Sequence, residues 1–407
     1  MKHSPFLAGL VALAASSVVA VAVAQLPSHE TGPVIIGVLT DLSGSSSDMA
    51  GQGSVEAVKL AVMDAGGTVL GRKVEVIAGD HQLKPDVAAN LARQWYDTAG
   101  VQFIVDVPVS SAGLAVQAVA NEKHKLFVTT ATLTSDFTDR FCSPYSMQWN
   151  YNTVALARAA ASAAIRRGLK RWFFLTADYA FGLALQRDAT KTLLAEGGAV
   201  AGSALHPFNS PDLTSFVLQA MGSDAQAIAL ANGPPDNVTA IKEANEFGLA
   251  GSGKAVISMF TTLTDIRSLG LSTAAGLTFP DSFYWDRDDL SRQWSARFKA
   301  VYGREPTSVQ AADYSATLHW LKAVAAAGTL DPLVVAAKMR SMPVNDAFVR
   351  DGLLRPDGLM VHDLYLLRVK QPSESHGEWD LLQVLDTIPG PTVFPTLEEE
   401  ERCRLAR

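Results

Sequence analysis

Short runs of β-branched and other apolar residues alternate with amphipathic stretches over the first part of the chain. The runs have the length of strands and occupy residues 34–39, 74–78, 101–107 and 126–129. The stretches between them carry apolar residues at helical spacing and occupy residues 54–65, 85–99 and 111–123. Continuous apolar runs are typical of strands buried on both faces, so this alternation predicts a parallel sheet with helices on both sides.

The same alternation begins again after Cys142, Ser143 and Pro144. Strands are predicted over residues 171–175, 200–205, 227–231 and 256–260. Helices are predicted over residues 153–167, 182–196, 213–221 and 238–247. Because one architecture is repeated, we expect an α/β protein with two similar lobes.

The last third of the chain is richer in helices. These are predicted over residues 290–302, 308–327 and 331–342. A strand-like run at 360–369 is followed by residues 379–385, which we expect to pair with it as a hairpin. We interpret these elements as additions to the two lobes and not as a third domain.

The composition and charge of the chain exclude some classes of protein. The 407 residues are 48% hydrophobic and 18% charged, which excludes wholesale disorder. The formal net charge of −7 argues against a nucleic-acid partner, since phosphate binding needs a basic face.

The N-terminal segment has the pattern of a secretory signal. Residues 6–24 carry no charge and end in Ala22-Val23-Ala24, the small-x-small pattern of a cleavage site. We therefore predict a signal peptide over residues 1–24, cleavage near Ala24 and a periplasmic protein; a retained membrane anchor is the alternative. In an oxidising compartment Cys142 and Cys403 favour one disulfide, with two free thiols as the alternative.

The sequence does not match the motifs of several common enzyme classes. Residues 248–255 nearly match a P-loop, but Ala255 replaces the hydroxyl residue that binds magnesium, and the segment precedes a strand. The sequence has no G-x-S-x-G elbow and no H-E-x-x-H, and two cysteines alone make no zinc site. We expect neither an enzyme nor a bound cofactor or metal.

Small polar residues follow the predicted strands of the first unit. Ser46 lies in the turn after the first strand, Ser110 and Ser111 open a helix, and Thr132 and Thr134 follow a later strand. In a parallel sheet these turns share one edge, where helix N-termini and hydroxyl groups suit a carboxylate. Helix capping is the alternative for any one of them.

The corresponding turns of the second unit carry different side chains. Tyr179 and Phe181 could cover an apolar ligand, while Asn232 and Thr261 could fix its polar end; core packing is the alternative for the two aromatic residues.

None of these turns contains arginine or lysine, so neutral donors would hold a carboxylate. Asp178, Asp236 and Asp265 are available to meet an ammonium group. Whether one of them does so distinguishes an amino-acid ligand from a plain acid.

Several stretches, in this order and spacing, resemble a known family. They are residues 35–44, 108–111, 130–132, 176–182, 281–286 and 310–315. The chain resembles the periplasmic substrate-binding proteins of ABC importers, in the branch related to the leucine/isoleucine/valine-binding protein.

The resemblance implies the type I fold of two lobes, each a parallel sheet flanked by helices, joined by a hinge of three crossing segments. It places the crossings near residues 143–147, 280–285 and 354–358. The first lobe would comprise residues 33–143 plus 285–354, and the second 144–284 plus 355–395. Residues 396–407 would form a tail.

The resemblance also implies a site and partners. Ser110, Ala131 and Thr132 match the groups that hold a ligand carboxylate, and Phe181 or Tyr179 matches the aromatic cover. The first loop has Ser46 or Ser47 where amino-acid binders often carry an aromatic, which brings the chain closer to the branch for aromatic or other organic acids. A monomer delivering a small ligand to an inner-membrane ABC permease is expected; a sensing module that reports to a membrane receptor is the alternative.

Overall fold

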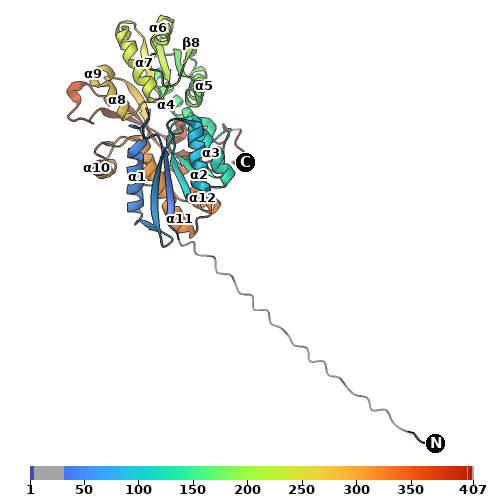
Figure 1. Ribbon diagram of the computed structural model, residues 1–407. Coiled ribbons are helices and arrows are strands. Elements are labelled where there is room, and N and C mark those ends of the chain that lie inside the picture. The colour runs from blue at the N-terminus through green and yellow to red at the C-terminus, as the bar shows by residue number, and fades with distance from the viewer. Residues whose placement is uncertain (4–31, 401, 406–407) are drawn as a thin grey trace. The chain divides into compact units, whose positions relative to one another are not determined.

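The first lobe is built on a six-stranded sheet. The computed structural model describes residues 1–3, 32–400 and 402–405 (Figure 1), so all but the first three residues of the predicted signal, with its cleavage position at Ala24, lie outside the described part. The strand order is β2-β3-β1-β4-β5-β6, and every pairing is parallel except that of β2 with β3. The strands are β1 (Val34–Thr40), β2 (Thr68–Val69), β3 (Arg72–Asp80), β4 (Val101–Asp106), β5 (Leu126–Thr129) and β6 (Ser146–Gln148).

Helices cover both faces of this sheet. They are α1 (Gly51–Asp64), α2 (Pro85–Asp97) and α3 (Ser110–Lys123). Alternate residues of β4 enter different cores: Phe103 lies in the cluster on the α1 side, and Ile104 in the cluster with α2 and α3. Burial on both faces explains why Val101, Phe103, Ile104 and Val105 of β4 are all apolar, with polar residues only at Gln102 and at the end of the strand, Asp106. The predicted parallel sheet is confirmed.

The three long helices from the last third of the chain pack against the first lobe. They are α10 (Asp289–Tyr302), α11 (Ser308–Ala327) and α12 (Pro332–Ser341). α11 packs along α1, and Trp320 of α11 stacks on Phe103 with 4.6 Å between the ring centroids. Among the described residues no single helix meets the length and apolarity of a membrane span, although α11 and α12 would do so jointly across a 109° bend.

The second lobe contains a parallel sheet of order β10-β9-β7-β8 and an antiparallel sheet of order β11-β14-β15. Its strands are β7 (Arg171–Ala177), β8 (Ala199–His206), β9 (Ala227–Ala231), β10 (Ala255–Ser258), β11 (Thr278–Asp281), β14 (Leu364–Val369) and β15 (Leu382–Ile388). Its helices are α4 (Thr153–Arg166), α5 (Ala180–Ala195), α6 (Thr214–Gly222), α7 (Pro234–Glu246), α8 (Leu263–Leu269), α9 (Leu271–Ala274) and α13 (Gly390–Val393). Figure 1 shows α5 to α7 and β8 grouped in this lobe.

Short elements account for the differences from the sequence-based prediction. The run at 360–369 is split into β13 (Met360–Val361), which pairs with β12 (Leu353–Leu354), and β14, which forms the expected hairpin with β15. The remaining short pieces are 3₁₀ turns at η1 (Ser135–Phe137), η2 (Leu249–Gly251) and η3 (Pro372–Glu374). Ser146–Gln148, at the end of the segment where the first crossing is expected, form the edge strand β6.

Candidate functional site

A small cavity lies where turns of the first lobe meet turns of the second. Its free volume is about 20 Å³, which is about the space of one water-sized sphere. The first lobe lines it with Ser46, Met49, Val109, Ser110, Ala131 and Leu133, and the second with Tyr179, Phe181, Phe208, Pro234, Pro235 and Phe260. No lining residue carries a formal charge, so the cavity combines apolar walls with two hydroxyl groups on its first-lobe side.

Ser110 is positioned with one hydrogen left to donate. It is the first residue of α3 and is buried. Its Oγ accepts hydrogen bonds from the N–H groups of Leu133 (3.2 Å) and Thr134 (3.1 Å). A serine hydroxyl has two acceptor sites and one donor, so both acceptor sites are filled and the O–H can turn to a ligand oxygen.

The turn that leads to Ser110 holds an unusual backbone. Asp106, Val107 and Val109 all have positive φ, at 85°, 65° and 72°. Such values are strained for residues other than glycine, and most of all for β-branched valine. Val109 occupies the N-cap position of α3, and no side chain caps the helix. Its carbonyl accepts from the N–H groups of Ala112 and Gly113, which leaves those of Ser110 and Ser111 available beside the Ser110 hydroxyl.

Two buried carboxyl groups lie beneath this turn. The Thr130 hydroxyl lies 2.6 Å from Asp313 Oδ1 and 3.3 Å from Asp106 Oδ1, and all three side chains are fully buried. Burial raises the pKa of Asp106 to about 7, and burial together with the Asp106 charge raises the pKa of Asp313. Because two anions this close repel each other, we infer that the pair carries a proton near neutral pH.

Stability is therefore expected to depend on pH. Burial raises the pKa of Asp106 and of Asp281 to about 7, so the folded chain binds more protons than the unfolded chain between about pH 4 and pH 7. Burial lowers the pKa of His81 and of His362 to about 4, which acts in the opposite sense, but only below about pH 6.5. We predict that the melting temperature falls as the pH rises from 6.5 to 8.5.

The control for this prediction is Asp281→Asn, which keeps the shape of the side chain and removes its titration. Its melting temperature should change less between pH 6.5 and 8.5 than that of the unmodified protein. A melting temperature that rises with pH over this range would contradict the assignment of raised pKa values.

The second-lobe wall is a cluster of aromatic rings. Tyr179 lies against Phe208 with 4.3 Å between centroids and an interplanar angle of 30°, and Phe181 contacts Phe260 edge-on at 5.4 Å. Tyr179 and Phe181 sit at the start of α5, whose close approach to the sheet needs Gly182. A Cβ there would lie 2.1 Å from the carbonyl oxygen of Ala177, so no larger residue allows this placement.

Five of the predicted site residues line the cavity, namely Ser46, Ser110, Ala131, Tyr179 and Phe181. The other five lie near it with different contacts. Ser111 is half-buried, and Thr134 caps the turn at η1 by accepting from the Asp136 N–H at 3.3 Å. The Thr132 hydroxyl donates to the Val107 carbonyl at 2.8 Å, and its N–H donates to Thr129 Oγ1 at 2.7 Å.

The two polar residues of the second lobe also lie outside the lining. Asn232 Oδ1 is 3.0 Å from His206 Nε2, and Thr261 pairs with the Ser258 hydroxyl. Sequence reasoning missed Phe208, which follows the carboxyl end of β8. Ligands bind at the carboxyl ends of parallel strands, so Phe208 could have been predicted if apolar residues in these turns had been considered as well as polar ones.

The three aspartates considered as ammonium partners do not line the cavity. Asp178 is exposed, and Asp236 accepts from the N–H groups of Asn209 (3.1 Å) and Ser210 (2.9 Å). Asp265 accepts from the Thr262 N–H at 2.8 Å in the capping box of α8.

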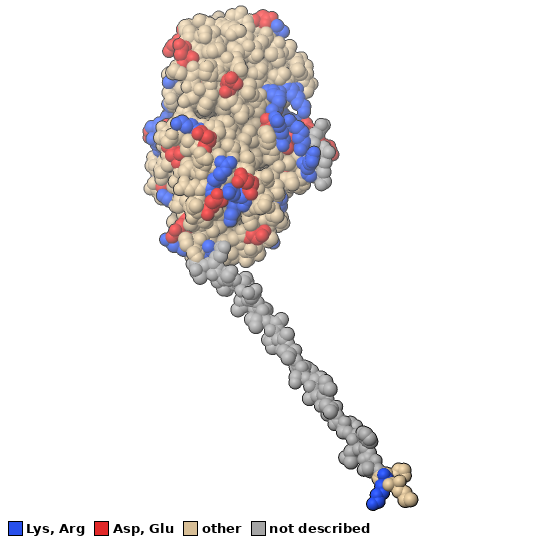
Figure 2. Space-filling view, turned by 45° about the vertical axis from the view of Figure 1, so that its right-hand side comes forward, with Lys and Arg blue, Asp and Glu red and all other residues tan. Residues whose placement is uncertain are grey.

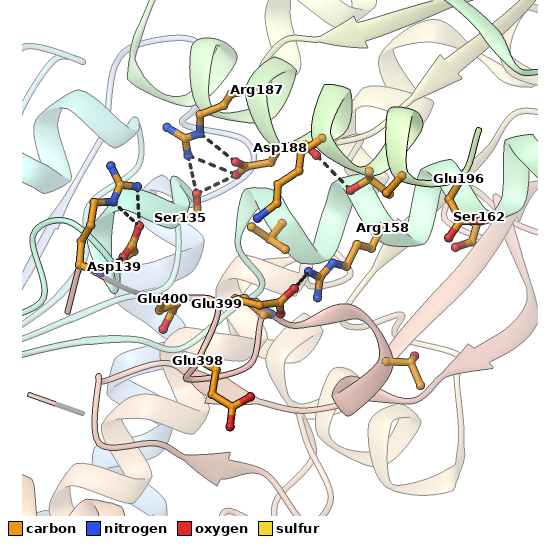
Figure 3. Close-up of a pocket in the computed structure, with 17 residues that line it drawn as sticks. Ser135, Asp139, Arg158, Ser162, Arg187, Asp188, Glu196, Glu398, Glu399 and Glu400 are labelled. Carbon is orange, nitrogen blue, oxygen red and sulfur yellow. Dashed lines mark hydrogen bonds and ion pairs between the residues drawn. The ribbon is translucent and has the colours of Figure 1, made fainter. Parts of the chain in front are cut away.

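A larger hollow of about 700 Å³ lies between α4, α5 and the C-terminal residues (Figure 3). Several of its labelled side chains pair, among them Arg158 with Glu399 at 2.5 Å and Arg187 with Asp188 at 2.9 Å. Charged walls of this kind do not suit an apolar ligand, so we take the interlobe cavity as the candidate site.

Figure 2 shows basic and acidic side chains interspersed over wide uncharged areas of the face it presents.

Known proteins match the chain over most of its length. The model of the family described as periplasmic binding protein matches residues 33–376. A periplasmic binding protein of Burkholderia mallei is 44% identical, with a TM-score of 0.89 over 92% of this chain and 99% of that one. A periplasmic ligand-binding protein of a branched chain amino acid ABC transporter, from Burkholderia xenovorans LB400, is 39% identical, with a TM-score of 0.83 over 92% of this chain and 100% of that one.

A curated relative is more distant. The Leu/Ile/Val-binding protein homolog 6 of Brucella suis biovar 1 is 22% identical over 249 residues, which are 60% of this chain. The match spans 63% of the length of that relative.

Proposed function

The chain belongs to the periplasmic binding protein family, and from this premise we propose that it captures a small monocarboxylate with an aromatic or other apolar body. The observation that carries the proposal is the interlobe cavity, which sets the Ser110 hydroxyl and the N-terminus of α3 opposite a wall of aromatic rings. The donors would hold the carboxylate, and the rings would cover the body. In this proposal the mature chain begins after Ala24, acts as a periplasmic monomer and delivers its ligand unchanged to an ABC permease.

The lining supports a ligand that carries no amino group. A buried ammonium needs an anionic or carbonyl partner, because transfer of an unpaired charge from water costs far more than a hydrogen bond returns. Asp236 and Asp265 are buried, but their oxygens already accept backbone N–H groups of the second lobe. This supports an organic acid over an amino acid as the ligand, the choice that the sequence alone left open.

We predict that matched pairs of compounds will separate the two ligand classes. Each pair differs only by the amino group: 3-phenylpropanoate against phenylalanine, and 4-methylpentanoate against leucine. A ligand present at 100 times its Kd stabilises the folded chain by about 2.7 kcal/mol, which raises the melting temperature measurably. An acid of the panel should raise it and its amino-acid partner should not.

The outcome that would contradict the proposal is a rise with the amino acid and none with its matched acid. Recovery of the bound acid from the protein, with its mass unchanged after prolonged incubation, is the accompanying measurement for binding without turnover.

A further inference from the structure

The C-terminal residues run along the junction of the two lobes. We call residues 390–403 the strap; of these, residue 401 lies outside the described part. The strap begins in the second lobe, where α13 packs against α4. Val393 and Phe394 are buried in the same apolar cluster as Leu156 of α4, so this end is fixed by packing.

Arg158 of α4 holds the strap to the second lobe a second time. Its Nη1 donates to the Phe394 carbonyl at 3.1 Å, and its Nη2 donates to Glu399 Oε1 at 2.5 Å. The Arg158 side chain is 24% exposed, so this pair is only partly screened by water.

The middle of the strap touches the third crossing segment. Arg355 lies between β12 and β13 and is buried. Its guanidinium donates to the Pro395 carbonyl and, at 2.5 Å, to Glu400 Oε2. The strap is therefore bound to the hinge as well as to the lobes.

The end of the strap is fastened to the first lobe. The Thr138 hydroxyl donates to Glu400 Oε1 at 3.0 Å, and Arg402 donates to Asp139 through Nε at 2.7 Å. Cys403 forms a disulfide with Cys142, with 5.6 Å between the Cα atoms and 261 positions between them in sequence. This end is thus joined covalently to the segment that follows β5.

The strap does not pack along its whole length. The hollow of about 700 Å³ in Figure 3 is lined by strap residues such as Glu398 and, from the second lobe, by α5 and its C-cap residue Glu196. The strap is therefore held by discrete contacts. Phe394 and Glu399 bind the second lobe, and Glu400, Arg402 and Cys403 bind the first. When the lobes rotate apart, at least one set must stretch or break.

We propose that the strap is a fourth connection between the lobes, beside the three crossing segments, and that it limits how far they open. The disulfide keeps charged partners such as Arg402 and Asp139 close together. An ion pair that breaks can therefore re-form at a high effective concentration. Reduction of the disulfide removes the covalent bond at the first-lobe end and leaves the Arg402–Asp139 ion pair and the Thr138–Glu400 hydrogen bond there. The proposal depends on the hinged fold and not on the identity of the ligand.

The test is the radius of gyration from small-angle X-ray scattering, measured on the mature protein without added ligand. Two variants release opposite ends of the strap: Cys142→Ser/Cys403→Ser frees the first-lobe end, and Arg158→Met weakens the second-lobe end with the disulfide intact. The matched control is Arg171→Met, which breaks an exposed ion pair with Asp224 inside the second lobe. Circular dichroism and a cooperative melt identify the variants that are folded.

The expected result is a larger radius of gyration for both strap variants than for the unmodified protein and for Arg171→Met. If the cysteine variant does not fold, Arg158→Met with its intact disulfide decides alone. An unchanged radius of gyration in the folded strap variants overturns the proposal. Because no ligand is added, this outcome is separate from any failure of the proposed carboxylate ligand.

Discussion

Replacing Ser110 by alanine is expected to weaken the binding of a carboxylate ligand by about ten- to a hundredfold. The Ser110 O–H is the hydroxyl of α3 that lines the cavity, and its acceptor sites are filled by Leu133 and Thr134. A hydrogen bond to a charged group contributes about 1.5–3 kcal/mol, and each 1.4 kcal/mol is a factor of ten in affinity. Isothermal titration calorimetry with the acid identified by the thermal-shift panel measures the loss directly.

Alanine at this position also leaves two backbone N–H groups without their acceptor, which costs stability as well as affinity. Chemical denaturation without ligand separates the two effects, because only the change in affinity depends on the ligand. Ser111→Ala is the matched control: it removes the neighbouring hydroxyl, which does not line the cavity. Equal affinities for Ser110→Ala and the unmodified protein would show that the ligand carboxylate does not bind at the N-terminus of α3.

Replacing Arg355 by methionine is expected to lower the free energy of unfolding by about 3–5 kcal/mol. Asp357 is buried and pairs with the Arg355 guanidinium, and Glu400 lies at the same group. Burial and the Asp357 charge raise the pKa of Glu400, so Asp357 is the principal anion of the cluster. Without Arg355 the buried Asp357 charge loses the cation that is hydrogen-bonded to it and keeps only the more distant charge of Arg340.

Urea denaturation gives the free energy of unfolding for this comparison. The double variant Arg355→Met/Asp357→Asn removes the buried charge along with its partner and should recover part of the loss. A loss of less than 1 kcal/mol in the single variant would show that water reaches Asp357 and that the cluster contributes little to the hinge.

The lobes could be predicted from the sequence because buried parallel strands leave a strong pattern. Within Val101–Asp106, apolar side chains enter the cores on both faces of the sheet, and each predicted run of this kind is a strand. The three-residue strand β6 leaves no such pattern. It forms because Tyr145 and Thr129 offer carbonyl partners to Phe127 and Trp149, and those contacts are defined only once the sheet exists.

The candidate site was predictable at the level of turns but not of side chains. The rule that ligands bind at the carboxyl ends of parallel strands led to the turns of Ser110, Ala131 and Tyr179, all of which line the cavity. The rule does not say which way a side chain points. Thr132 lies in the same turn as Ala131, yet its hydroxyl is directed at the Val107 carbonyl.

The packing of α10 to α12 on the first lobe delays the completion of that lobe during synthesis. Phe103 has its stacking partner only when Trp320 is present, more than two hundred positions later. The second lobe takes its parallel sheet from one continuous stretch, but β14 and β15 join it from still later in the chain. Long-range contacts of this kind slow folding, so a chain emerging from its N-terminus completes neither lobe until its last third is present. A slow completion would suit a chain that is exported before it folds, as the proposed periplasmic location requires.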